Sequence, residues 1–167
     1  RQRGTLRVFG ADGAELVRSP LPREGLFEAH ADSLIWCSPM SWFARGLAGC
    51  AWRPVDEDAR TVFRFDPERK SWERAPEFPD DVADLALHRG KGLVSCWDGS
   101  VYRIDREGRV LGKVDAGGPC RLRWSADGSF AVAGVRSGEV LCLDAEGRPR
   151  WRTLLPAAAP EPLKSAP

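Results

Sequence analysis

The chain has 167 residues, of which 43% are hydrophobic and 29% are charged, as in an ordinary globular unit with its own core. Its formal net charge of +1 lacks the basic excess typical of proteins that bind nucleic acids or anionic membranes. No apolar run is long enough for a transmembrane helix, and the first residues do not resemble a signal peptide. We therefore expect a protein partner, with no nucleic acid and no membrane.

Five cysteines are spread along the chain without a Cys-x-x-Cys pair: Cys37, Cys50, Cys96, Cys120 and Cys142. Each falls in or beside an expected strand, which predicts free thiols that behave as small buried hydrophobic side chains. With only two histidines in the chain, a zinc site is not expected, and we expect no metal and no cofactor. Free thiols favour a reducing compartment, so the expected location is cytoplasmic.

A repeat of 39 residues organises the sequence. Thr61, Val62, Phe63 and Asp66 recur as Ser100, Val101, Tyr102 and Asp105, and again as Glu139, Val140, Leu141 and Asp144. Gly99 and Gly138 open the second and third copies, and a degenerate earlier copy begins at Gly4. A fixed period of about 40 residues, built from strand–turn–strand units, is typical of a β-propeller.

The first expected strands, 5–9 and 15–18, align with strands C and D of the later units and form an outer half-blade over 1–19. The segment 21–27 is expected to be a connection. The next unit, 33–74, is expected to hold strand A at 33–37, B at 47–52, C at 60–66 and D at 70–74. Its A–B and B–C connections, 38–46 and 53–59, are longer than those of the later units.

The two remaining units are more regular. We expect strands at 82–87, 93–97, 100–105 and 109–114 in the unit 82–114, and at 120–124, 129–135, 139–144 and 148–153 in the unit 120–155. Between the first two strands of the last unit, Asp127 and Gly128 stand where a tight hairpin turn requires them. His88, in the turn after 82–87, is expected in solvent. The Pro/Ala-rich tail, 156–167, is expected to be disordered or extended.

Several motifs resemble those of known propeller families. Ser125-Ala-Asp-Gly128 resembles the Ser-Pro-Asp-Gly turn of WD40 repeats, and the segment 30–34 resembles the start of a WD40 blade. Asp66, Asp105 and Asp144 occupy the aspartate position of the Trp-Asp pair that ends strand C in that family, whereas Trp97-Asp98 falls in a B–C turn. The segment 63–72 resembles a kelch repeat, and 144–151 resembles the docking motif of quinoprotein-like propellers. The resemblance implies a WD40-like propeller and leaves the exact family open.

The strand count predicts an all-β fold: a partial β-propeller of three four-stranded antiparallel blades plus an outer half-blade. Complete propellers have about four to eight blades. Because Met40 is the only methionine, we also expect the chain to belong to a longer polypeptide. The missing strands are expected from another protein chain or from the N-terminal half of the same propeller. That segment would pair along Leu6, Val8 and Phe9, since an isolated hairpin is marginal in water.

Two loops are candidate binding sites. Met40, Trp42, Phe43 and Arg45 are of residue types enriched at interface hot spots, although the loop could instead fold back over its own blade. Asp56, Glu57 and Asp58 form an acidic rim that could bind a basic peptide, or calcium with extra oxygen ligands, or could simply face solvent. No spacing typical of a calcium-binding loop supports calcium.

The chain has no Gly-x-Ser-x-Gly sequence and no phosphate-binding loop, so no catalytic residue is expected. These features favour a non-enzymatic scaffold or sensor module, the C-terminal half of a larger WD40-like propeller in a multi-component assembly. The alternative is half of a kelch- or quinoprotein-like enzyme whose catalytic residues lie in the other half.

Overall fold

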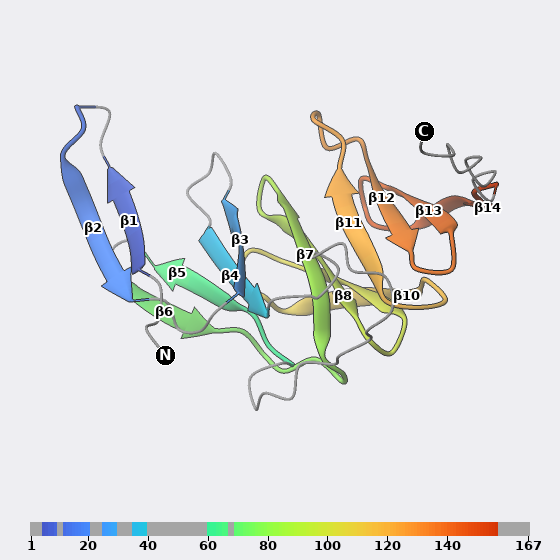
Figure 1. The fold of residues 1–167 in the computed structure, drawn as a ribbon, viewed down its shortest axis with the longest axis horizontal. Helices are drawn as coiled ribbons and strands as arrows, with labels where there is room; N and C mark the ends of the chain where they lie inside the picture. The colour runs from blue at the N-terminus through green and yellow to red at the C-terminus, as the bar shows by residue number, and fades with distance from the viewer. Residues whose placement is uncertain are drawn as a thin grey trace, which may run out of the picture.

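The computed structural model describes residues 5–9, 12–20, 25–29, 35–39, 60–66 and 69–156. All regular elements in these ranges are β-strands (Figure 1). Accordingly, the described residues contain no helix of the length and apolarity needed to cross a bilayer. The strands are β1 (Thr5–Phe9), β2 (Glu15–Pro20), β3 (Gly25–Ala29), β4 (Ile35–Pro39), β5 (Phe63–Asp66), β6 (Ser71–Arg74), β7 (Val82–His88), β8 (Lys91–Cys96), β9 (Ser100–Ile104), β10 (Val110–Asp115), β11 (Cys120–Trp124), β12 (Phe130–Val135), β13 (Glu139–Asp144) and β14 (Pro149–Leu154).

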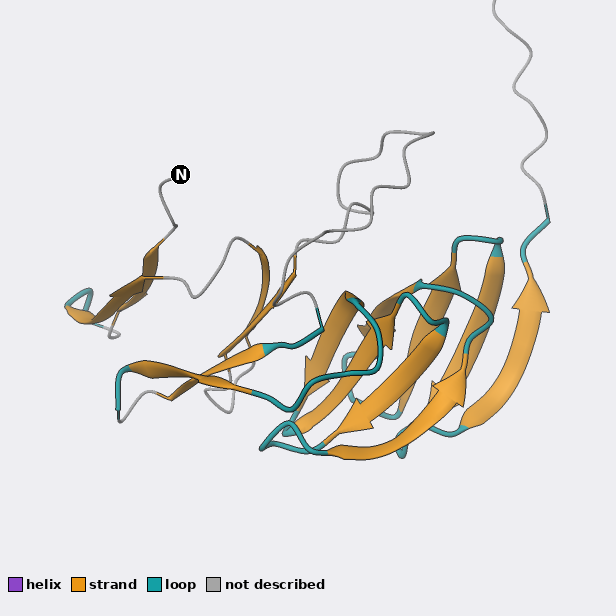
Figure 2. Ribbon diagram, turned by 90° about the horizontal axis from the view of Figure 1, so that it is seen from below, coloured by secondary structure: helices purple, strands orange, loops and turns teal. Residues whose placement is uncertain are grey.

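The strands form one hairpin, β1–β2, and three four-stranded antiparallel sheets. Each larger sheet takes four consecutive strands, and we call these sheets blade 1 (β3–β6), blade 2 (β7–β10) and blade 3 (β11–β14). The first strand of blade 2, β7, contacts both β3 of blade 1 and β11 of blade 3. Figure 2 shows the blades following one another along the molecule as twisted sheets. The expected all-β partial propeller is confirmed.

Blade 2 is covered on both faces, which explains why its inner strands are almost continuously apolar. Residues 82–86 of β7 and 92–96 of β8 are all buried. One face packs against Val62, Ala75 and Phe78 of blade 1, and the other packs against residues of blade 3 that include Leu122 and Leu141. Each fully buried valine or leucine contributes about 1.5–3 kcal/mol, so the contacts between blades supply much of the core.

The cysteines of blades 2 and 3 behave as the sequence predicts. Cys96, Cys120 and Cys142 are buried free thiols. Burial raises the pKa of Cys120 to about 11 and also raises the pKa of Cys96. Both thiols therefore stay protonated and inert near neutral pH. The side chain of Cys37 and the whole of Cys50 lie outside the described residues.

The turn between β11 and β12 is held by its own side chains. Asp127 accepts hydrogen bonds from the N–H of Ser129 (3.0 Å) and the hydroxyl of Ser125 (2.7 Å), which lower its pKa to about 2. Gly128 has a φ of 72°, and a Cβ there would overlap the ring of His88. His88 is half-buried, with its ring centroid 6.0 Å from that of Trp124. The expectation that His88 faces solvent is wrong, because the turn of the next blade covers it.

The first two strands of blade 1 differ from the prediction. Strand A is β3, in a segment expected to begin as a connection, and strand B is β4, which overlaps the segment expected as strand A. The sheet position expected for 47–52 is thus filled by β4, while 47–52 itself lies outside the described residues. Blade 1 therefore begins at Gly25 rather than at residue 33. The longest stretch of sequence between two strands of blade 1 follows strand B (β4). The 39-residue spacing therefore locates the strands after this stretch and not β3 and β4 before it.

The N-terminal hairpin has the expected strands. Leu6 pairs with Ser19, Val8 with Val17 and Phe9 with Glu15. The hairpin is joined to blade 1 through Trp72 of β6, whose indole Nε1 donates to the carbonyl of Pro20 at 3.0 Å. Figure 1 shows β2 beside β6, so the hairpin stands at the blade 1 end of the stack.

Candidate functional site

The connection from the third to the fourth strand of each blade is capped by an aspartate. The carboxylate of Asp105 accepts the N–H groups of Glu107 (3.0 Å) and Arg109 (2.8 Å). Asp144 accepts those of Glu146 and Arg148 at 2.9 and 2.8 Å. The N–H of Arg148, followed by that of Glu146, holds the pKa of Asp144 below its ordinary value. The repeated aspartates therefore fix a turn whose carbonyl groups point toward the preceding blade.

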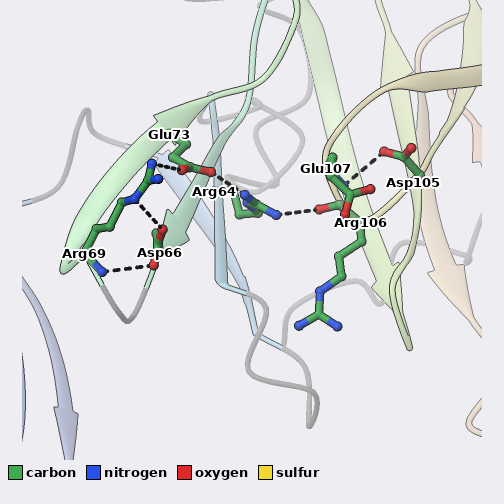
Figure 3. Close-up of polar contacts among 7 residues, drawn as sticks. All are labelled: Arg64, Asp66, Arg69, Glu73, Asp105, Arg106 and Glu107. Carbon is green, nitrogen blue, oxygen red and sulfur yellow. Dashed lines mark hydrogen bonds and ion pairs between the residues drawn. The ribbon is translucent and has the colours of Figure 1, made fainter.

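An arginine of the third strand binds this turn in the next blade. Arg64 of β5 donates from Nη1 to the carbonyl of Arg106 in blade 2, at 3.2 Å (Figure 3). Arg103 of β9, one repeat later, donates from Nη1 to the carbonyl of Glu146 in blade 3. We call these two contacts the arginine latches. They join blade 1 to blade 2 and blade 2 to blade 3 at the outer edge of the stack.

The strand register shows what stands beside each latch. Cα partners across the third and fourth strands are Arg64 and Glu73 in blade 1, and Arg103 and Gly112 in blade 2. In blade 3 the corresponding partners are Cys142 and Trp151. In the first latch the arginine therefore has a carboxylate beside it, and in the second latch it has none. In blade 3 a cysteine and a tryptophan stand at the two equivalent positions.

Glu73 completes the first latch. Its carboxylate forms a close ion pair with Arg64 and also receives a hydrogen bond from Nη1 of Arg69 at 3.3 Å. Figure 3 shows Arg69 reaching Asp66 and Glu73, with Glu73 lying between Arg69 and Arg64. The side chains of Arg64 and Glu73 are only 23% and 33% exposed, so this pair is better shielded from water than an ordinary surface pair.

Nearer the inner edge, two side chains of blade 2 accept hydrogen bonds from backbone N–H groups of blade 3. Asp84 accepts the N–H of Leu122 at 2.9 Å, and the hydroxyl of Ser95 accepts the N–H of Cys120 at 3.0 Å. Burial raises the pKa of Asp84, although the N–H of Leu122 and the guanidinium of Arg121 act in the opposite direction. These bonds align β11 against β7 and β8.

A groove of about 260 Å³ lies where the outer strands of blade 2 meet blade 3. Its lining comes from β9, β10 and the turn before β14: Val101, Arg103, Gly112, Lys113, Val114, Gly147, Arg148 and Pro149. The lining contains three basic residues and no acidic residue. Such a groove suits an anionic group attached to an apolar one.

The face of blade 3 that points away from blade 2 is partly apolar. Val132, Cys142 and Trp151 are successive Cα partners and therefore lie on one face, opposite Leu141 and Leu143, which pack toward blade 2. Trp151 is 50% exposed. In the described part of the chain, no further sheet covers this face.

The sequence-predicted site residues fall in two groups. The loop residues, and the acidic rim, all lie outside the described residues: Met40, Trp42, Phe43, Arg45, Asp56, Glu57 and Asp58. In the sequence, both segments lie between β4 and β5. Leu6, Val8 and Phe9 lie on β1, which among the described strands pairs only with β2. The pairing of a foreign strand along β1 stays a prediction.

Sequence reasoning missed the arginine latches. Their signal was available, because Arg64 and Arg103 stand one repeat of 39 residues apart at the same position of the third strand. Within the described residues, no group of three or more histidine, cysteine or acidic side chains is arranged to hold a metal ion.

Comparison with known proteins gives a match in structure and none in sequence. No protein-family description matches the chain, and no curated protein is similar to it in sequence. Among solved structures, the chain is similar to a chain of the crystal structure titled mitotic checkpoint complex, with 15% identity and a TM-score of 0.63. The match covers 90% of this chain and 44% of that chain. The likeness supports the partial β-propeller fold, and this chain spans less than half the length of the matched chain.

Proposed function

We propose that this chain is a non-enzymatic interaction scaffold or sensor module, the C-terminal half of a larger WD40-like propeller within a cytoplasmic, multi-component assembly. Its partner is another protein chain or the N-terminal half of the same propeller. Rigid blades present variable loops in such scaffolds, and the loops select the partner.

One observation carries the proposal: among the described residues, both ends of the stack of blades expose apolar side chains. Arginine latches join blade 1 to blade 2 and blade 2 to blade 3. Among the described strands, the hairpin β1–β2 pairs with no third strand, and the outer face of blade 3 is partly apolar. A two-stranded hairpin is marginal in water, and an exposed sheet edge readily accepts another strand. The fold likeness to one chain of a multi-protein complex agrees with a role among protein partners.

Co-purification tests this function. The chain is produced together with the polypeptide encoded upstream of it, each with its own tag, and the complex is isolated through either tag. We expect a stoichiometric complex that unfolds in one cooperative transition, because shared blades would couple the two halves. Two independently unfolding species would contradict the proposal. A metal or cofactor constellation in the upstream polypeptide would instead favour the propeller enzyme.

A further inference from the structure

A glycine lines the groove between blades 2 and 3 at the position that carries Glu73 in blade 1. In blade 1, Glu73 is the Cα partner of Arg64 and its carboxylate occupies the place beside the arginine latch. One repeat later, the Cα partner of Arg103 is Gly112. Blade 2 therefore has the same arginine, and glycine stands at the position that carries the carboxylate in blade 1.

Arg103 keeps its bonds to the backbone and lacks a carboxylate. It donates from Nη1 to the carbonyl of Glu146 and from Nη2 to the carbonyl of Leu111 at 3.3 Å. Among the described residues, no acidic side chain lies within ion-pair distance of Arg103, and its buried Nε has no hydrogen-bond partner. The guanidinium is thus held in place by the protein while its charge is left unneutralised.

The space beside Arg103 can hold another group. A Cβ built on Gly112 would lie 3.7 Å from Nη2 of Arg103, which is ordinary contact, and it would meet no other atom within 4 Å. Gly112 is not among the glycines with a left-handed backbone, so the glycine is not required by the local conformation. Its absence of a side chain leaves the groove open.

The remaining lining defines the chemistry of a ligand. Arg148, in the turn before β14, adds a second basic residue to the lining, although its charge also acts on Asp144. Val101, Val114 and Pro149 are the apolar residues of the lining. Arginine matches the planar, two-oxygen geometry of a carboxylate. Because apolar residues line the same groove, an acidic side chain with apolar neighbours fits it best.

We propose that this groove binds a glutamate or aspartate side chain, flanked by apolar residues, from an extended segment of a partner protein, in the place that Glu73 fills in blade 1. The inference rests on the proposed function, because it gives the chemistry of one partner of the scaffold. In this proposal, a carboxylate of the partner protein takes the place beside Arg103 that the chain's own position 112, a glycine, leaves unfilled.

Peptide binding to the full chain tests the proposal. Fluorescently labelled Gly-Val-Glu-Val-Gly and its Gly-Val-Gln-Val-Gly counterpart are titrated with the protein, and fluorescence anisotropy gives each Kd. We expect the glutamate peptide to bind about two- to fivefold more tightly, as for a partly exposed ion pair. The difference should disappear at about 1 M NaCl, where charges are screened within about 3 Å. Equal affinities at low salt would overturn the proposal.

Variants at position 112 supply the control. Gly112→Ala adds only a Cβ and should keep the preference for glutamate, whereas Gly112→Glu supplies its own carboxylate and should abolish it. Gly112→Glu should also melt at a higher temperature than Gly112→Gln, since only the charged side chain restores the ion pair of blade 1. A preference retained in Gly112→Glu, or equal melting of the Glu and Gln variants, would contradict the assignment.

Inorganic phosphate distinguishes a general anion site from a carboxylate site. If phosphate displaces the glutamate peptide at lower concentrations than acetate does, the carboxylate assignment is wrong. Displacement by acetate at equal or lower concentrations would support it. This assay reports on the groove alone, so its failure is distinguishable from failure of the upstream polypeptide to complete the scaffold.

Discussion

At the scale of single residues, some aspartates of this chain cap turns, whereas another joins two blades. Asp105 and Asp144 cap exposed turns, where backbone N–H groups stabilise the charged carboxylate. Asp84 lies instead between two blades and is 2% exposed. Its hydrogen bond to Leu122 aligns the blades, but burial penalises its charge. Asp84 therefore couples the packing of two blades to a carboxyl group whose charged form is disfavoured by burial.

Asp84 should make the stability of the chain depend on pH. Burial raises the folded-state pKa of Asp84 above the ordinary 3.8. The contribution of Asp84 to the free energy of unfolding is therefore fully present below pH 3.8, and it is lost as the pH rises through the raised pKa. Asp84→Asn can still accept the N–H of Leu122 and cannot ionise. Urea unfolding of both proteins should show the wild type losing stability relative to Asp84→Asn as pH rises above 3.8. A difference that stays constant, or moves the other way, would show that Arg121 and Arg123 outweigh burial.

At the scale of elements, the arginine latch is the recurring link between blades, and its strength varies with what supports it. Arg64 has both a carboxylate, Glu73, and the carbonyl of Arg106, whereas Arg103 binds carbonyls alone. In blade 3 the position is Cys142. Along three repeats, this strand position thus holds an arginine with a carboxylate neighbour, an arginine without one, and a buried cysteine.

A double-mutant cycle on Arg64→Met and Glu73→Gln should measure the support that Glu73 gives the first latch. We expect a coupling of about 0.5–1 kcal/mol in the free energy of unfolding, because both side chains are partly shielded. The matched control is the pair Arg74 and Glu77, which are 45% and 62% exposed with N and O 2.7 Å apart. Its coupling should be near zero. Equal coupling in the two cycles would mean that the latch adds nothing beyond a surface pair.

The sequence predicted the elements where the repeat is regular and failed where it is interrupted. Blades 2 and 3 keep the 39-residue period, and their strands and the turn at Asp127 and Gly128 lie as expected. In blade 1 a long stretch of sequence lies between β4 and β5, so the repeat does not locate β3. The alternation of polar and apolar residues was then the remaining signal for β3, and it is weak because two of its five residues are glycine and alanine. The groove could not be predicted, because its lining combines residues of blade 2, such as Gly112, with residues of blade 3, such as Pro149, and the sequence does not show how closely the two blades pack there.

At the scale of the whole molecule, the two ends of the stack are alike in exposing apolar side chains. Phe9 and Leu16 of the hairpin are 54% and 56% exposed, and Trp151 and Leu154 of blade 3 are 50% and 65% exposed. Terminal repeats of a stable solenoid carry a polar outer face, which blade 3 lacks. The exposed ends therefore favour association with further protein, as the proposed function requires.

The chain alone should therefore self-associate through its open ends. Analytical ultracentrifugation over a range of concentrations should show a sedimentation coefficient that rises with concentration. Trp151→Glu, on the open face of blade 3, should reduce this association because it places a charge in the apolar contact. Leu111→Glu is the matched control: Leu111 is 53% exposed on the outer strand of blade 2, which already has a blade on each side, and its change should have little effect. A monomer at all concentrations that unfolds cooperatively would contradict the open-ended propeller, and equal effects of the two variants would remove blade 3 from the contact.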